Sequence, residues 1–152
     1  PIFYARQTDA AGNVSAVSAA FTFTFDTTAP KSSAVTLPAA GTYAVGSKIS
    51  VTVTFPENVF VGGAGAAPFL ALKVGTVTRN AVLGSGSGTN TLVFSYTLVT
   101  ADLNQTVTLP SATISLPTGT TLRDTAGNDA TLSLTLPSAW SSIVVQIGRA
   151  HV

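Results

Sequence analysis

The chain has 152 residues, of which 45% are hydrophobic and only 9% are charged. Such a chain can bury a core, which excludes a disordered tail. The formal net charge is +1 without a basic cluster, which argues against nucleic-acid binding. No apolar run approaches the roughly 20 residues that span a bilayer. The absence of cysteine excludes thiol catalysis, zinc–thiolate sites and disulfide bonds.

Residues 1–25 have the pattern of one β-hairpin. Ile2 to Thr8 predicts a strand, Asp9-Ala-Ala-Gly-Asn13 a turn, and Ala19 to Phe25 a second strand in which Phe and Thr alternate. A lone hairpin is not a stable domain. Because the chain also lacks methionine, we expect residues 1–25 to be the C-terminal remnant of a preceding domain in a longer protein.

Asp26-Thr-Thr-Ala-Pro30 follows as a linker. Pro30 fixes its own φ and pushes Ala29 toward extended geometry, so residues 26–30 predict a stiff joint. We expect this joint to connect two tandem β-domains.

Residues 31–146 are predicted to form a complete all-β domain. Alternation is clear in Ile49 to Phe55 and Leu92 to Leu98, turn signals such as Gly62-Gly63 separate the runs, and no window has a helical period. This pattern favours an immunoglobulin-like β-sandwich. The predicted strands are Ser33–Leu37, Lys48–Phe55, Phe69–Val74, Val77–Leu83, Thr91–Leu98, Thr106–Leu116 with an interruption at Pro110, Ala130–Leu136 and Ser141–Val145.

One short motif occurs twice. Asp9-Ala-Ala-Gly-Asn13 returns as Asp124-Thr-Ala-Gly-Asn128, each time in the last predicted hairpin of its domain. Repeats placed in this way indicate an array of similar domains.

These motifs resemble the tandem bacterial Ig-like repeats of large surface adhesins, including repetitive biofilm proteins of the RTX type. The resemblance extends from Phe3 to about Val145 and also includes Phe55-Pro-Glu-Asn-Val59 and Gly84 to Thr91. It implies a stalk module for cell adhesion, extracellular or at the bacterial cell surface, with neighbouring Ig-like repeats as partners. Family members often bind calcium near domain junctions. This chain departs from the family at Pro56, where such repeats commonly have serine.

The last residues, Ile147 to Val152, do not continue the pattern, because another Asp-Thr-Thr-Ala-Pro linker would be expected there. We interpret residues 147–152 as a non-native tail, a translated sequencing adapter. The alternative is a genuine polar tail.

The acidic residues predict a calcium site. All six fall in predicted turns or linkers. In an Ig-type sandwich, Asp26 before the first strand, Glu57 after the second, and the last hairpin loop with Asp124, Asn128 and Asp129 lie at one pole. Calcium takes about six to eight oxygen ligands from such groups. The alternative is that these acids simply favour solvated turns.

Three other polar residues belong to this interpretation. Asp9 and Asn13 form the equivalent loop of the truncated domain, whose other ligands would be missing. Asp102 is expected at the opposite pole, where it would contribute to the next junction. The loop that follows it is poorer in acids than in many relatives.

Catalysis is not expected. Hydroxyl side chains are abundant, but the only histidine, His151, lies in the tail, so no base is present to activate them. Glu57 with Asp124 would be a carboxylate pair of the glycosidase kind, yet no aromatic residues cluster near either.

Two other functions remain open. The pole loops would suit a carbohydrate- or protein-binding module, with Tyr4, Tyr43 and Trp140 as a sugar-stacking surface. Alternatively, the chain is an accessory domain of a secreted hydrolase. The adhesion target is not predicted.

Overall fold

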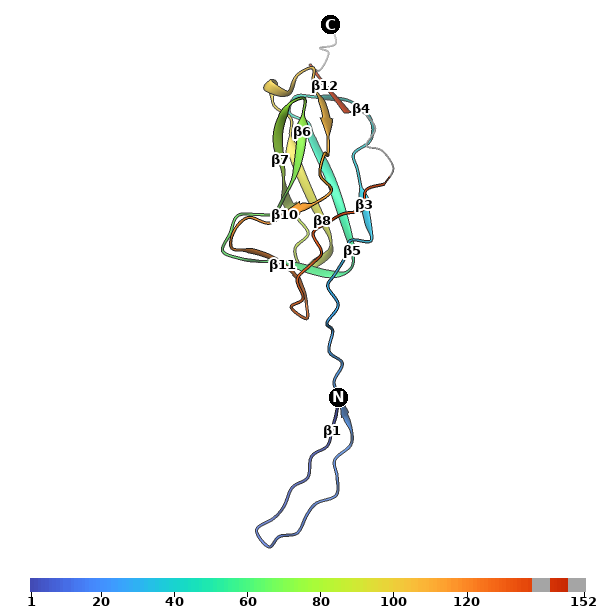
Figure 1. Cartoon of the computed structure of the whole chain (residues 1–152), viewed down its shortest axis with the longest axis vertical. Helices are drawn as coiled ribbons and strands as arrows, with labels where there is room; N and C mark the ends of the chain where they lie inside the picture. The colour runs from blue at the N-terminus through green and yellow to red at the C-terminus, as the bar shows by residue number, and fades with distance from the viewer. Residues whose placement is uncertain (138–142, 148–152) are drawn as a thin grey trace.

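The computed structural model describes residues 1–137 and 143–147 (Figure 1). In this part of the chain ten strands form one curled, mixed sheet and two more form a separate hairpin. The one helical element there is a short 3-10 helix, η1 (Thr100–Asp102). The predicted all-β class is confirmed, in a form consistent with a sandwich, while the immunoglobulin-like identity stays a prediction. None of the described residues form a helix with the length and apolar character to cross a membrane.

The N-terminal hairpin extends away from the main sheet (Figure 1). Its strand β1 (Ile2–Phe3) pairs antiparallel with β2 (Phe21–Thr22). Both strands are shorter than the sequence predicts, and a bridge between Thr8 and Val14 closes the far end. A two-stranded ribbon without a third layer supports little regular pairing.

The hairpin has no core of its own. Every residue from Pro1 to Ala29 is exposed. Phe23 contacts the rings of Phe3 and Phe21 edge to face, with centroids 5.6 Å and 4.5 Å away. These aromatic contacts stay on the surface because nothing in the described chain packs over them.

The strands of the main sheet are β3 (Ala34–Thr36), β4 (Gly41–Ala44), β5 (Lys48–Gly63), β6 (Phe69–Val74), β7 (Val77–Ser85), β8 (Thr89–Thr97), β9 (Thr106–Thr108), β10 (Ile114–Ser115), β11 (Thr120–Asp124) and β12 (Ile143–Gln146). Their order is β11-β5-β8-β7-β6-β9-β12-β4, with β10 beside β6 and β3 beside β5. The pairing of β12 with β4 is parallel, and the other pairings are antiparallel.

β5 is the longest strand among the described residues and pairs with three others. In its first half Ile49, Val51, Val53 and Phe55 alternate with polar residues and are buried, as the period of a strand requires. One edge of β5 pairs with β8, and the other edge pairs first with β3 and then with β11. The position of β5 therefore determines where these three strands lie.

β5 does not end at Phe55, as the sequence predicts, but continues to Gly63. Its register with β8 shifts around Pro56-Glu57, which indicates a bulge. Proline lacks the N–H that a regular ladder needs and is tolerated at bulges. The prediction that Gly62-Gly63 forms a turn between strands is therefore wrong, since both glycines belong to β5 and pair with β11.

Other predicted strands agree with the structure to different degrees. Phe69–Val74 has the same bounds as β6, and Val77–Leu83 and Thr91–Leu98 lie close to those of β7 and β8. Ser33–Leu37 contains β3. The predicted strand Ser141–Val145 begins outside the described residues, and its second part lies in β12.

The sequence misses two strands of the sheet and predicts one that does not form. β4 and β11 were not expected, because strands at the ends of the sheet order face the core only in part and show little apolar alternation. Ala130–Leu136 forms no named strand, since its backbone bonds are divided between different segments. The Ala130 N–H donates to Leu122 and the Thr131 N–H donates to Pro30. Leu132 accepts from the N–H of Ile114, and Leu134 donates to Ala112.

One buried charge, Asp102, lies in the loop that runs beside β12. Its carboxylate accepts hydrogen bonds from Arg79 Nε at 3.1 Å, the Tyr96 hydroxyl at 2.8 Å and the Val99 N–H at 3.0 Å. The side chain is 1% exposed. The alternative that the acids simply favour solvent is wrong for Asp102, because its carboxylate is buried and bonded inside the domain. Its loop does lie at the end of the domain opposite the linker (Figure 1).

These contacts change the pKa of Asp102 in a definite direction. Burial raises the pKa of this carboxyl, but the hydrogen bonds from Val99, Tyr96 and Arg79 and the charge of Arg79 lower it by more, so it lies below the ordinary value. The same burial, together with the bond to Asp102, raises the pKa of Tyr96.

We expect Asp102→Asn to lower the free energy of unfolding at pH 7 by about 2–3 kcal/mol, the value of a hydrogen bond to a charged group. Because the folded-state pKa is depressed, this stabilisation is present above the unfolded pKa and is lost as the pH falls through the folded pKa. Urea unfolding from pH 7 down to pH ~2.5 should show the two proteins converging.

The matched control is Asp129→Asn, which removes an exposed carboxylate paired with Arg123. It should cost less than about 1 kcal/mol. Equal losses in the two variants would contradict a special role for the buried carboxylate.

Candidate metal site

The loop Asp124–Asn128 is closed by its own hydrogen bonds. Asp124 Oδ1 accepts the Asn128 backbone N–H at 2.9 Å, and Oδ2 accepts the Asn128 side-chain amide at 2.8 Å. The Gly127 N–H donates to the Asp124 carbonyl at 3.2 Å, with Gly127 at a φ of +93° that glycine adopts without strain. The loop therefore holds the Asp124 carboxylate in one orientation.

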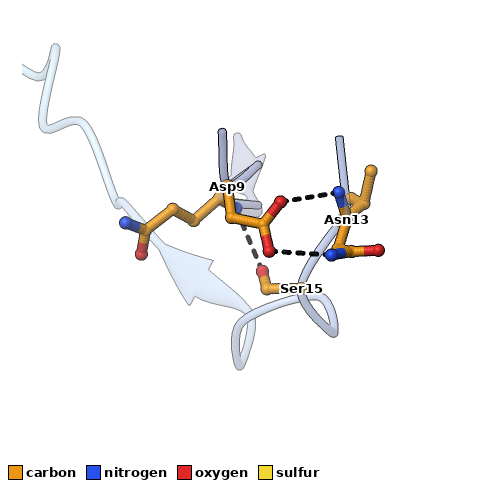
Figure 2. A pocket seen from close by; sticks show the side chains of 5 residues that line it. Asp9, Asn13 and Ser15 are labelled. Atoms are coloured by element: carbon orange, nitrogen blue, oxygen red, sulfur yellow. Dashed lines mark hydrogen bonds between the residues drawn. The ribbon is translucent and has the colours of Figure 1, made fainter. Parts of the chain in front are cut away.

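The loop Asp9–Asn13 is built in the same way (Figure 2). Asp9 Oδ1 accepts the Asn13 backbone N–H at 2.9 Å, and Oδ2 accepts the Asn13 side-chain amide at 2.9 Å. The Gly12 N–H donates to the Asp9 carbonyl at 3.0 Å, and Gly12 has a φ of +89°. Hydrogen bonds from Asn13 also lower the pKa of Asp9.

The flanking backbone matches as well. In each hairpin a β-bridge joins the two residues that flank the loop. One residue further from the loop, the N–H of the second strand donates to the carbonyl of the facing residue of the first strand at 2.8 Å. The contacts are Thr8–Val14 and Ser15 to Gln7 in the first hairpin, and Arg123–Asp129 and Ala130 to Leu122 in the second. The sequence repeat is therefore also a structural repeat.

The linker is fastened to the second loop. The Asn128 amide donates to the backbone carbonyl of Asp26 at 3.2 Å, and the Thr131 N–H donates to the carbonyl of Pro30 at 2.9 Å. Pro30 is buried, and the Thr28 N–H donates to Asp26 Oδ1 at 2.9 Å. Both ends of residues 26–30 are thus attached to the domain that they enter.

Asp26, Glu57 and Asp124 meet at this end of the domain. One carboxylate oxygen from each lies within 4.8 Å of the others. Asp26 comes from the linker and is exposed, Glu57 comes from the bulge of β5 and is half-buried, and Asp124 ends β11 and is buried. Glu57, predicted in a turn, lies instead at the bulge within β5. Asp124 is the last residue of β11 and opens the predicted hairpin loop.

The pKa values of Glu57 and Asp124 are shifted in opposite directions. Burial raises the pKa of Glu57, and the negative charges of Asp124 and Asp26 raise it further. Burial also raises the pKa of Asp124, but hydrogen bonds from Asn128, Gly127 and Ala126 lower it by more. Glu57 is therefore the member that resists ionisation.

The other predicted ligands are not among the three clustered carboxylates. Asp129 Oδ1 is 2.6 Å from Arg123 Nε, and the pair is exposed outside the cluster. Asn128 uses its amide nitrogen for its contacts with both Asp124 and Asp26, and its carbonyl oxygen takes part in neither. Asp9 and Asn13 lie in the N-terminal hairpin, beyond the linker (Figure 1).

The three carboxylates fit a hard cation such as calcium by their chemistry. They offer only oxygen donors, which calcium prefers, and calcium tolerates irregular geometry. Both oxygens of Asp124 already accept hydrogen bonds from Asn128, so only their remaining lone pairs are available. The cluster would supply part of a coordination shell, and water would have to supply the rest.

The proposed aromatic surface does not form from its described members. Tyr4 lies on the hairpin, whereas Tyr43 lies on β4 at the other end of the domain (Figure 1). The Tyr43 hydroxyl donates to the Ala39 carbonyl at 2.8 Å. Trp140, His151 and the rest of the predicted tail from residue 148 lie outside the described residues.

Comparison of the chain with protein-family models, curated proteins and solved structures gives no match. The resemblance to bacterial Ig-like adhesin repeats therefore stays a prediction from the sequence motifs.

We expect Glu57→Gln to raise the melting temperature of the chain in the presence of a chelator, because it removes a charge held beside Asp26 and Asp124. The pKa of Glu57 is higher in the folded chain than in the unfolded chain. The contribution of protonated Glu57 to folding stability is therefore fully present below the unfolded pKa and is lost as the pH rises through the folded pKa. The advantage of the variant should therefore be seen at pH 7 and vanish below pH ~4.

Thermal melts at a series of pH values in chelator provide the measurement. Asp129→Asn removes an acid outside the cluster and should give no such advantage. A lower melting temperature for Glu57→Gln at pH 7 would show that the carboxylates do not repel each other as the geometry indicates.

Proposed function

We propose that the chain is a structural extension module, one link in a tandem array of β-sandwich domains that forms the stalk of a bacterial adhesin. The observation that carries this proposal is the repeated loop, with the same hydrogen bonds before and after the linker. A hairpin without a core, followed by a linker and by a domain that has the same loop in its last third, is what a tandem array predicts.

The course of the chain supports an elongated array. The linker enters at the end of the domain where β11 finishes, and β12 lies at the opposite end (Figure 1). A following domain would then continue in line with the first. In such arrays each unit contacts mainly its neighbours, so length grows with the number of units.

The joint has the features of a restricted hinge. Proline limits the conformations of residues 26–30, and the carbonyls of Asp26 and Pro30 are held by Asn128 and Thr131. Bending at the domain end of this linker requires breaking both bonds. A stalk needs this property, since loose joints would allow its tip to fold back.

In this proposal calcium completes the joint by binding Asp26, Glu57 and Asp124. The cation would offset the repulsion among three acids and tie the linker to β5 and β11. A ligand that binds only the folded joint stabilises it by mass action, by about 2.7 kcal/mol at one hundred times its Kd. The proposed location is extracellular or at the bacterial cell surface.

The calcium part is tested by thermal melts of the whole chain in excess calcium and in chelator. We expect calcium to raise the melting temperature of the wild type and to give little or no rise in Asp26→Asn and Glu57→Gln. Glu57→Gln should thus be the more stable protein in chelator and the less stable one in calcium.

Asp129→Asn is the matched control, because its carboxylate pairs with Arg123 outside the cluster. It should keep the full response to calcium. Identical wild-type curves in calcium and in chelator would remove calcium from the proposal.

The stalk itself is tested by duplication. A second copy of residues 26–147 is joined after residue 147 of the chain, so that the Asp26 linker follows β12. We expect the maximum dimension in small-angle X-ray scattering to grow by about one domain length. A dimension close to that of the single chain would show that the domains fold back on each other, which contradicts a stalk.

A further inference from the structure

The second loop holds the linker by two donors. Asn128 has two amide hydrogens, and its nitrogen lies 2.8 Å from Asp124 Oδ2 and 3.2 Å from the Asp26 carbonyl. Three positions later the Thr131 N–H donates to Pro30 at 2.9 Å. We call this pair of donors, Asn128 and Thr131, the linker clamp.

The first hairpin has the same two donors without the linker. The Asn13 amide bonds to Asp9 Oδ2 at 2.9 Å and to no second acceptor among the described residues. The N–H of Ala16, which corresponds to that of Thr131, has no acceptor there either. Asn13 also lines a hollow (Figure 2), together with Gln7, Asp9, Val14 and Ser15.

We propose that residues 9–16 form an open linker clamp that binds an extended Asp-Thr-Thr-Ala-Pro segment, the linker that leads into the hairpin's own domain. The inference rests on the proposed array, in which each domain is entered by such a segment. It assigns Asn13 and Ala16 to peptide binding, where the sequence predicts only an incomplete calcium loop.

The chemistry of the loop explains why asparagine is required. Its amide donates one hydrogen to the aspartate that closes the loop and a second to the linker carbonyl. Aspartate at this position has no donor when ionised, and serine has only one. A loop that served only as a turn would need the first bond but not the second.

The linker supplies matching acceptors. The clamp holds the carbonyls of Asp26 and Pro30, and the proline keeps the segment near Ala29 extended. The bond from Thr28 to Asp26 Oδ1 fixes the turn at the start. A segment without this turn and proline would have to be ordered on binding, at an entropic cost.

The test transfers the first loop into the folded domain. Thr125→Ala, Asp129→Val, Ala130→Ser and Thr131→Ala together replace residues 124–131 by the sequence of residues 9–16. Amide hydrogen exchange of position 131 is then measured in the whole chain, in chelator. We expect protection of this amide to stay within about threefold of the wild type, less than the loss of one hydrogen bond would change it.

The matched variant adds Asn128→Ala to the exchanged loop, and protection of position 131 should then fall roughly fivefold, as for a lost hydrogen bond. The amide of Phe94, in the core, reports whether the fold is intact. An unprotected amide at 131 beside a protected Phe94 would overturn the clamp. The readout is independent of calcium and of array length, so failure of the proposed stalk would not imitate this result.

Discussion

The bulge in β5 is the constraint on which the domain and its candidate site both depend. On one side of the bulge the strand pairs with β3, and on the other side it pairs with β11, while β8 runs along the opposite edge. The extra residues let Pro56 stay in a strand and place Glu57 beside Asp124. β11, which ends at Asp124, pairs only with the part of β5 that follows the bulge.

Asn128 connects this sheet to the linker. One nitrogen atom contacts the carboxylate that closes its own loop and the backbone carbonyl of Asp26. The same group therefore shapes the turn, positions an acid and fastens the joint. These contacts of Asn128 fix the direction in which the linker enters the domain, in a chain that has few charges and no cysteine.

The strands that the sequence predicts best are those in which buried and exposed residues alternate. Strands buried in the middle of the sheet, such as Phe69–Val74, follow from alternation alone. Edge strands such as β4 do not, because half of their surroundings is solvent. Glu57 was expected in a loop since proline usually ends a strand, and only tertiary pairing shows the bulge. The burial of Asp102 depends on Arg79 and Tyr96, which come from two other strands.

The contact between the linker and Asn128 also has a consequence for the order of folding. The hydrogen bond from Asn128 to Asp26 connects two residues that are 102 positions apart in the sequence. During synthesis the linker emerges first, and its partner Asn128 appears only after most of the domain, β3 to β11, has been made. A contact with such long sequence separation closes late, after the loop-closure entropy of the intervening chain has been overcome. In the proposed array, each linker would therefore be fastened only after most of the domain that it enters has folded.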